Sequence, residues 1–292
     1  MIAQKKNELL LEIYLLLLAG VILFWFVRWG GDLPQVFQNI DLFYILSVIG
    51  AYTLSHVFRM MRLAMLSLDQ RNQILPLVSC HAVTALPSSM LPFKIGEIIR
   101  LGSFFYVLKT RKALAIWLAE RFVDISVISL FILILYFFNI DVPKQLRTIF
   151  ILFFVFSLLA LMAFFAVSKV FIYLNRYLVL ASSSKHGLQL LKISHHLRQL
   201  EDAIFRSFEG RFASVFLLSV FIWLAEIAGM ALFLKSLNTD FKAISHYFLA
   251  GLSGVFYEST AKVSYDIYQD VVLILLAIIF GLIVFVGKRL SR

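Results

Sequence analysis

Six stretches of this 292-residue sequence are long and apolar enough to cross the hydrocarbon core of a membrane as helices, which takes roughly 17–25 residues. They lie at residues 11–28, 41–58, 113–138, 149–170, 212–235 and 269–287. A soluble domain is about 45–50% apolar and about 25% charged, whereas this chain is 61% apolar and 15% charged. The sequence therefore excludes a soluble enzyme domain. It predicts an all-α polytopic membrane protein that forms a single integral membrane domain over residues 1–292.

Two further apolar segments are interrupted. The first covers residues 75–108 and is broken by three prolines and a glycine: Pro76, Pro87, Pro92 and Gly96. The second covers residues 243–262 and is broken by Gly251 and Gly254. A helix interrupted at membrane depth needs protein or a wet cavity to shield its loosened backbone. Each segment is therefore expected to be a re-entrant hairpin or a pair of half-helices. In the first, Pro87 and Pro92 are expected to stop one helix, and a new one should begin near Gly96.

The basic residues are distributed unevenly between the connecting segments. Twenty Lys and Arg residues lie in residues 1–12, 59–112, 169–211 and 287–292, and five lie in residues 28–41, 139–148 and 235–242. The positive-inside rule then predicts that both termini are cytoplasmic, in a plasma (cytoplasmic or inner) membrane. The halves 1–140 and 141–292 would enter the membrane from opposite sides, as in an inverted-topology repeat whose substrate site lies where the broken elements meet.

The one long soluble connection, residues 171–211, contains an amphipathic pattern. Its apolar residues recur at helical spacing: Leu190, Ile193, Leu197, Leu200, Ile204 and Phe208. Lys192, Arg198 and Arg206 lie elsewhere on the wheel. The pattern indicates either a basic helix lying on the inner leaflet or a helix packed under the bundle.

The start of the helix expected near Gly96 is a candidate anion site. Lys94 lies just before this start and Arg100 one turn after it, where free backbone N–H groups and the positive end of the helix dipole also favour a phosphate. Glu97, three residues before Arg100, can pair with that arginine when no anion is bound. The alternative is a capped helix start at the interface, with Lys94 and Arg100 reaching out to water.

Ionisable residues also occur inside the predicted spans, where they usually face a partner or a cavity. Glu120, Arg121 and Asp124 lie in the third span. Glu120 and Asp124 share a face, and Arg121 can pair locally with Asp124. Glu226 lies in the middle of a span with no basic neighbour on its own helix, so it must be protonated or paired with another helix. We consider it a candidate proton carrier, with Lys262 or Arg59 as its expected partner.

Two other pairs complete the candidate residues. Glu258 and Lys262 are four residues apart in the second broken segment and can neutralise each other. Arg59 and Arg62 share a helical face at the end of the second span and can bind headgroups. The alternative is simple positive-inside anchoring, which is favoured for Arg62 more than for Arg59.

Several kinds of function lack their sequence signals. The chain has no GxxxxGK[ST] loop, so ATP-driven transport is not predicted. It also has no GxSxG elbow, DxD pair, HExxH or CxxC, so no cofactor or metal site is predicted and an enzymatic role is not expected. Its single cysteine, Cys80, cannot form an internal disulfide. The net charge of +10 indicates contact with anionic lipid headgroups rather than nucleic acid.

The stretch Pro92-Phe93-Lys94-Ile95-Gly96-Glu97-Ile98-Ile99-Arg100, followed by Ala119-Glu120-Arg121-Phe122-Val123-Asp124, resembles the flippase-like family named for the transmembrane region of lysylphosphatidylglycerol synthase. The family carries P-x-[KR]-x-G-E-x-x-R and then E-R-x-x-D about twenty residues on, with basic residues matching Arg59 and Arg62. The sequence departs from the family in its second broken segment, where only Gly251, Gly254 and Glu258 match. It also lacks the soluble aminoacyl-transferase domain of the two-part synthases, so we do not expect it to make lysyl-lipid.

The resemblance implies a flippase that moves a phosphate-containing lipid, either a polyprenyl-phosphate-linked sugar or an aminoacylated phospholipid. Lys94, Arg100, Arg121 and Arg59 would bind the phosphate. A second set of residues would exchange ion-pair partners or carry protons. It consists of Lys262 and five carboxylates: Glu97, Glu120, Asp124, Glu226 and Glu258. Two alternatives stay open, a membrane-embedded transferase with Glu97 or Glu120 as base, and a non-transporting scaffold for a lipid-modifying enzyme.

Overall fold

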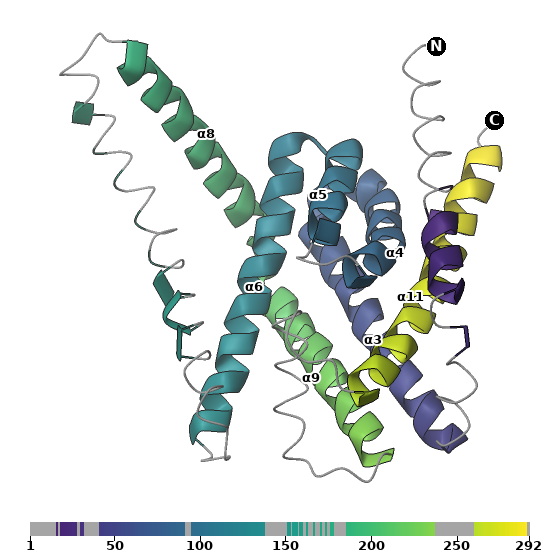
Figure 1. Ribbon diagram of the computed structural model, residues 1–292. Coiled ribbons are helices and arrows are strands. Elements are labelled where there is room, and N and C mark those ends of the chain that lie inside the picture. Colours follow the sequence, from purple (N-terminus) through teal and green to yellow (C-terminus); the bar gives the residue numbers. More distant parts are fainter. Residues whose placement is uncertain are drawn as a thin grey trace. The chain divides into compact units, whose positions relative to one another are not determined.

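The computed structural model describes residues 41–90, 95–137, 185–236 and 260–290 throughout, and parts of 16–31 and 151–177. The regular structure of these residues is helical (Figure 1). The labelled helices are α3 (Leu42–Leu66), η1 (Leu68–Gln73), α4 (Ile74–Met90), α5 (Ile95–Val107), α6 (Thr110–Phe137), α8 (Lys185–Phe208), α9 (Phe212–Ser236) and α11 (Thr260–Leu290). A short apolar helix, Leu18–Val27, precedes them. The predicted all-α class is confirmed for the part of the chain that the structure describes.

Three of the described helices are long and apolar enough to cross a membrane. They are Leu42–Leu66, Phe212–Phe233 and Asp266–Ile283, and they coincide with three of the six predicted spans. Helix α6 occupies the predicted span 113–138, but it contains more charged residues than the three apolar helices and is not counted with them. Most of the second broken segment, 243–262, lies outside the described residues, and the predicted span 149–170 is described only in part.

The first broken segment forms two helices, α4 and α5, with residues 91–94 outside the described part. Helix α5 begins at Ile95, so the helix start predicted near Gly96 is confirmed. The prediction that Pro87 stops the preceding helix is wrong, because α4 continues through Pro87 to Met90. Proline removes one backbone hydrogen bond within a helix, but neighbouring elements can compensate in a membrane protein.

Gly96 brings the start of α5 into direct contact with the end of α4. A Cβ atom on Gly96 would lie 2.2 Å from the Cα of Ser88 and 2.6 Å from its backbone nitrogen. Because both obstacles are backbone atoms, no side-chain rotation can relieve the clash. Glycine is therefore required here for packing.

Gly96→Ala is accordingly expected to destabilise the protein by about 1–3 kcal/mol, the usual cost of overpacking. The measurement is thermal unfolding of the purified protein in detergent. Gly102→Ala on the same helix is the matched control, since a Cβ there meets nothing within 4 Å. It should be neutral or stabilise α5 by up to about 1 kcal/mol. Equal stability of the two variants would contradict the close packing of α4 and α5.

The chain divides into two compact units. One comprises residues 1–56, 78–100 and 225–292, and the other residues 57–77 and 101–224. The first unit has a core of Ile45, Val48, Phe233 and Tyr268, in which the rings of Phe233 and Tyr268 meet edge to face at 5.7 Å. In the second, Lys112 of α6 donates to Ser207 of α8 at 2.9 Å and pairs with Asp69 of η1 at 2.8 Å. Lys112 therefore ties three elements together.

Helix α8 matches the predicted amphipathic helix and packs beside α6 (Figure 1). Among its described side chains, Ser194, Ile204 and Ser207 are buried, whereas Ile193 and Leu197 of the apolar stripe are exposed. The packed arrangement therefore holds for one face of α8, and contact of Ile193 and Leu197 with a membrane surface stays a prediction. The adjacent His195 and His196 are exposed.

Candidate functional site

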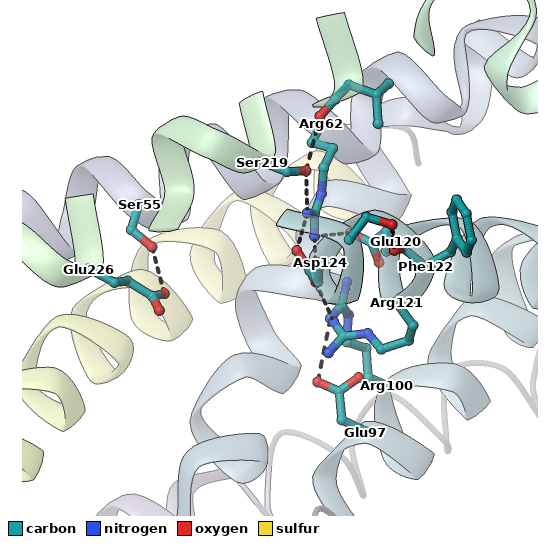
Figure 2. Close-up of polar contacts among 12 residues, drawn as sticks. Ser55, Arg62, Glu97, Arg100, Glu120, Arg121, Phe122, Asp124, Ser219 and Glu226 are labelled. Atoms are coloured by element: carbon teal, nitrogen blue, oxygen red, sulfur yellow. Dashed lines mark hydrogen bonds and ion pairs between the residues drawn. The ribbon is translucent and has the colours of Figure 1, made fainter. Parts of the chain in front are cut away.

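A buried arginine, Arg62 near the end of α3, is the centre of an ion-pair cluster in the second unit (Figure 2). Its guanidinium pairs with both carboxylate oxygens of Asp124 and lies 3.4 Å from Oε1 of Glu120. It also donates to the hydroxyl of Ser219 on α9 at 2.8 Å. That hydroxyl donates in turn to the carbonyl oxygen of Val215. The cluster therefore joins α3, α6 and α9.

The two acidic partners come from successive turns of α6. Glu120 and Asp124 are four residues apart, so both project from one face of the helix toward Arg62. Glu120 is fully buried and Asp124 nearly so. Burying two carboxylates is costly unless a cation with good hydrogen-bond geometry compensates them. Arg62 supplies this compensation.

Two further arginines add positive charge to the same cluster. Arg121 lies 3.5 Å from Oδ2 of Asp124, which confirms the predicted local pair. Arg59, one turn before Arg62, lies close enough for its charge to act on both Arg62 and Asp124. Three guanidinium groups therefore act on the buried carboxylate of Asp124. Arg59 and Arg121 are half-buried, whereas Arg62 is buried.

The main error of the sequence interpretation concerns Arg62. Simple anchoring at the headgroups is wrong for this residue, because its side chain is 1% exposed and engaged with Asp124 and Glu120. The sequence did contain an indication of this pairing. Two carboxylates on one face of a membrane helix favour a cation from a neighbouring helix, and α3 carries two arginines on one face.

The first unit contains the pair predicted at the start of α5. Arg100 lies 3.6 Å from Oε1 of Glu97, three residues earlier, which confirms their pairing. Arg100 is 3% exposed, so it does not extend to water as the alternative interpretation requires. Glu97 lies in the first turn of α5, beside the helix N-terminus. Lys94 lies outside the described residues.

Glu226 of α9 accepts a hydrogen bond from the fully buried hydroxyl of Ser55 on α3 at 2.9 Å, within the first unit (Figure 2). Sequence reasoning did not identify this serine, because a hydroxyl in an apolar helix carries no distinctive signal. Of the two partners expected for Glu226, Lys262 has its side chain outside the described residues, and Arg59 belongs to the second unit. Glu258 of the second broken segment also lies outside the described residues.

Among the described residues, no three His, Cys, Asp or Glu side chains are arranged to hold a metal ion. Cys80 is a free thiol on α4. The described ion pairs include contacts between helices, such as Arg62 with Asp124, and contacts within one helix, such as Arg121 with Asp124.

Apolar helices long enough to span a bilayer, with buried ion pairs between them, define an integral helical membrane protein. The chain belongs to the family described as lysylphosphatidylglycerol synthase TM region, whose model matches residues 13–257. The match includes the Arg62 cluster, Arg100 and Glu226, and it ends before α11. No curated protein and no solved structure matches the chain.

Proposed function

We propose that the protein is a lipid flippase that moves a phosphate-containing lipid across the bilayer. Its substrate would be a polyprenyl-phosphate-linked sugar or an aminoacylated phospholipid. The observation that carries the proposal is the gathering of three arginines, Arg59, Arg62 and Arg121, around the buried carboxylate of Asp124. Membership of a family named for the membrane region of a phospholipid synthase supports a lipid substrate.

In this mechanism the lipid phosphate is bound by charge-assisted hydrogen bonds from arginine, which suits bidentate recognition of phosphate. Arg59 and Arg121 supply these contacts in one unit, and Lys94 and Arg100 in the other, beside the N-terminus of α5. When the lipid leaves, carboxylates form ion pairs with the guanidinium groups that had bound the phosphate. In this mechanism Glu97, which pairs with Arg100, would hold that arginine when no lipid is bound. Because the sequence has no nucleotide-binding loop, a lipid gradient, the membrane potential or protons would drive transport.

The remaining parts of the proposal concern architecture and partners. Six spans and two broken segments would form an inverted repeat of residues 1–140 and 141–292. Glu226, Glu258 and Lys262 would serve as exchangeable ion-pair partners near the second broken segment. The protein would reside in the plasma membrane, with an anionic lipid as ligand and a lipid-modifying enzyme as a further partner.

The transferase alternative requires Glu97 or Glu120 as a free general base. Glu97 is paired with Arg100, and Glu120 is buried against Arg62. A base must reach the proton that it removes. These pairings therefore favour transport over transfer.

The test uses purified protein in vesicles that contain fluorescent phosphatidylglycerol and no co-substrate. We expect the protein to move the probe between leaflets, measured by quenching from outside. Arg121→Gln should slow this movement, and the control Arg206→Gln, which removes an exposed arginine of α8, should not. Absence of movement without a co-substrate would favour the transferase. Movement that is equal in both variants would remove Arg121 from the site.

The proposed topology predicts that residue 33 is extracellular and residue 184 cytoplasmic, since basic residues concentrate on the side of the termini. In a Cys80→Ala background, Leu33→Cys should react with an impermeant thiol reagent in intact cells. Ser184→Cys should react only after permeabilisation. The opposite pattern would invert the orientation.

A further inference from the structure

Asp270 is a buried carboxyl group within the apolar span Asp266–Ile283 of α11, and it lies beyond the family match. It is 9% exposed. An ionisable side chain in a membrane span is costly unless a partner neutralises it, so such residues usually have a function. The ion pairs described above do not involve Asp270.

Two neutral groups of the same unit hold this carboxyl. The indole Nε1 of Trp25, on the helix Leu18–Val27, donates to Oδ2 at 2.9 Å. The hydroxyl oxygen of Ser89 near the end of α4 lies 3.0 Å from Oδ1. Within the described part of the chain, no lysine or arginine forms an ion pair with Asp270. Among the described residues, an ionised carboxylate would therefore be buried with two neutral hydrogen bonds and no counter-ion, a costly arrangement.

The hydrogen-bond geometry around Ser89 indicates which form the carboxyl takes. The oxygen of Ser89 lies 2.9 Å from the carbonyl oxygen of Leu86 and 3.0 Å from Oδ1 of Asp270. A serine hydroxyl has one hydrogen, so it cannot donate to both acceptors, although its oxygen can also accept. If Oδ1 carries a proton, Asp270 donates to Ser89 and Ser89 donates to Leu86. Each of the two donors in this series of hydrogen bonds then has its own acceptor.

If the carboxyl is ionised, the hydroxyl of Ser89 must turn from Leu86 toward Asp270. Trp25 cannot exchange roles, because its indole nitrogen only donates. The exchangeable proton therefore belongs on Oδ1, next to Ser89. Ser89 is the exposed member of the network, so the proton would leave the buried site at this end.

The charged and titratable groups around the network leave Asp270 without a described counter-ion. The described residues of the helix Leu18–Val27 include none. On α4, the ring of His81 lies two turns before Ser89 and 5.9 Å from that of His56 on α3. On α11, Tyr268 packs against Phe233, and Asp266, one turn before Asp270, is exposed. That helix also carries Lys262, Lys288 and Arg289, at least two turns away, with side chains outside the described residues.

Helix α5 connects this network to the candidate phosphate site of the same unit. Gly96 packs on Ser88, the residue next to Ser89, and α5 carries Glu97 and Arg100, which pair with each other. A change in the hydrogen bonding of Ser89 therefore acts on the end of α4 that supports the start of α5.

We propose that Asp270 is a proton-binding site, a carboxylic acid that exchanges its proton with the surface through Ser89. We propose further that this exchange couples lipid movement to the proton gradient. The second statement rests on the proposed flippase function, and the first does not.

The proton site is tested by infrared spectroscopy of the full-length protein in lipid vesicles at neutral pH. The wild type should show a carbonyl band of a protonated carboxyl that shifts in heavy water. Asp270→Asn should lose this component, while its amide can still accept from Trp25 and donate to Ser89. Asp266→Asn, an exposed carboxyl on the same helix, is the matched control and should retain it. A spectrum unchanged by Asp270→Asn, in a variant with wild-type thermal stability, would overturn the site.

Coupling is tested with fluorescent phosphatidylglycerol in vesicles under opposite pH gradients. The rate of lipid movement is measured under each gradient, and the two rates are compared. If one proton is coupled to each lipid, their ratio should approach about tenfold per pH unit in the wild type and in Asp266→Asn. In Asp270→Asn the two rates should be equal. An Asp270→Asn variant that responds like the wild type overturns coupling and leaves the infrared result standing. A wild type that moves no lipid overturns the flippase function and the coupling together, again without affecting the infrared result.

Discussion

Arg62→Met is expected to destabilise the protein by about 3–5 kcal/mol, because it leaves the buried carboxylates of Glu120 and Asp124 without their main cation. Methionine fills the space along the aliphatic stem of the arginine and packs well in apolar surroundings, so the loss of the charged guanidinium dominates the effect. The measurement is thermal or denaturant unfolding of purified protein in detergent, together with the yield of membrane-inserted protein.

A compensating variant separates electrostatics from packing. Arg62→Met combined with Glu120→Gln and Asp124→Asn removes the buried arginine together with both of its carboxylate partners. It should recover most of the stability, since replacing a complete buried ion pair is often neutral. Arg206→Met on the exposed face of α8 should have little effect. If Arg62→Met alone were as stable as the wild type, the cluster would not hold α3, α6 and α9 together.

The same cluster shows how far the sequence could predict this structure. Local relations were predictable, because they depend on helical spacing alone: Glu97 with Arg100 and Arg121 with Asp124 both pair three residues apart. The start of α5 near Gly96 was predictable for a different local reason, the interruption of the apolar segment by Pro92 and Gly96. The class of the protein followed from hydropathy, because only helices satisfy every backbone group in lipid without a closed barrel.

Contacts between helices were not predictable to the same degree. Arg62 with Asp124, Ser55 with Glu226 and Trp25 with Asp270 join residues far apart in the chain. Which helices meet depends on packing, and no periodicity encodes it. Pro87 illustrates a different limit, because α4 continues through this proline although local propensity opposes it.

Lys94→Gln and Arg100→Gln are each expected to abolish most lipid translocation while leaving folding and insertion intact. Both residues flank the N-terminus of α5, where the helix dipole and the side-chain charge favour a phosphate together. Arg100 is buried beside Glu97, so its guanidinium is already desolvated before any lipid binds. A charge-assisted contact of this kind contributes roughly 1.5–3 kcal/mol, or about ten- to a hundredfold in binding.

Glu97→Gln distinguishes the role of the carboxylate from that of the cations. If Glu97 only holds Arg100 in the empty state, its amide still accepts a hydrogen bond from Arg100, and translocation should fall much less than in Arg100→Gln. The comparison uses fluorescent phosphatidylglycerol in vesicles, with expression and thermal stability matched across the three variants and the wild type. Wild-type rates in both Lys94→Gln and Arg100→Gln would show that these side chains only stabilise a helix end. The phosphate contacts would then have to come from Arg59 and Arg121 in the cluster around Arg62.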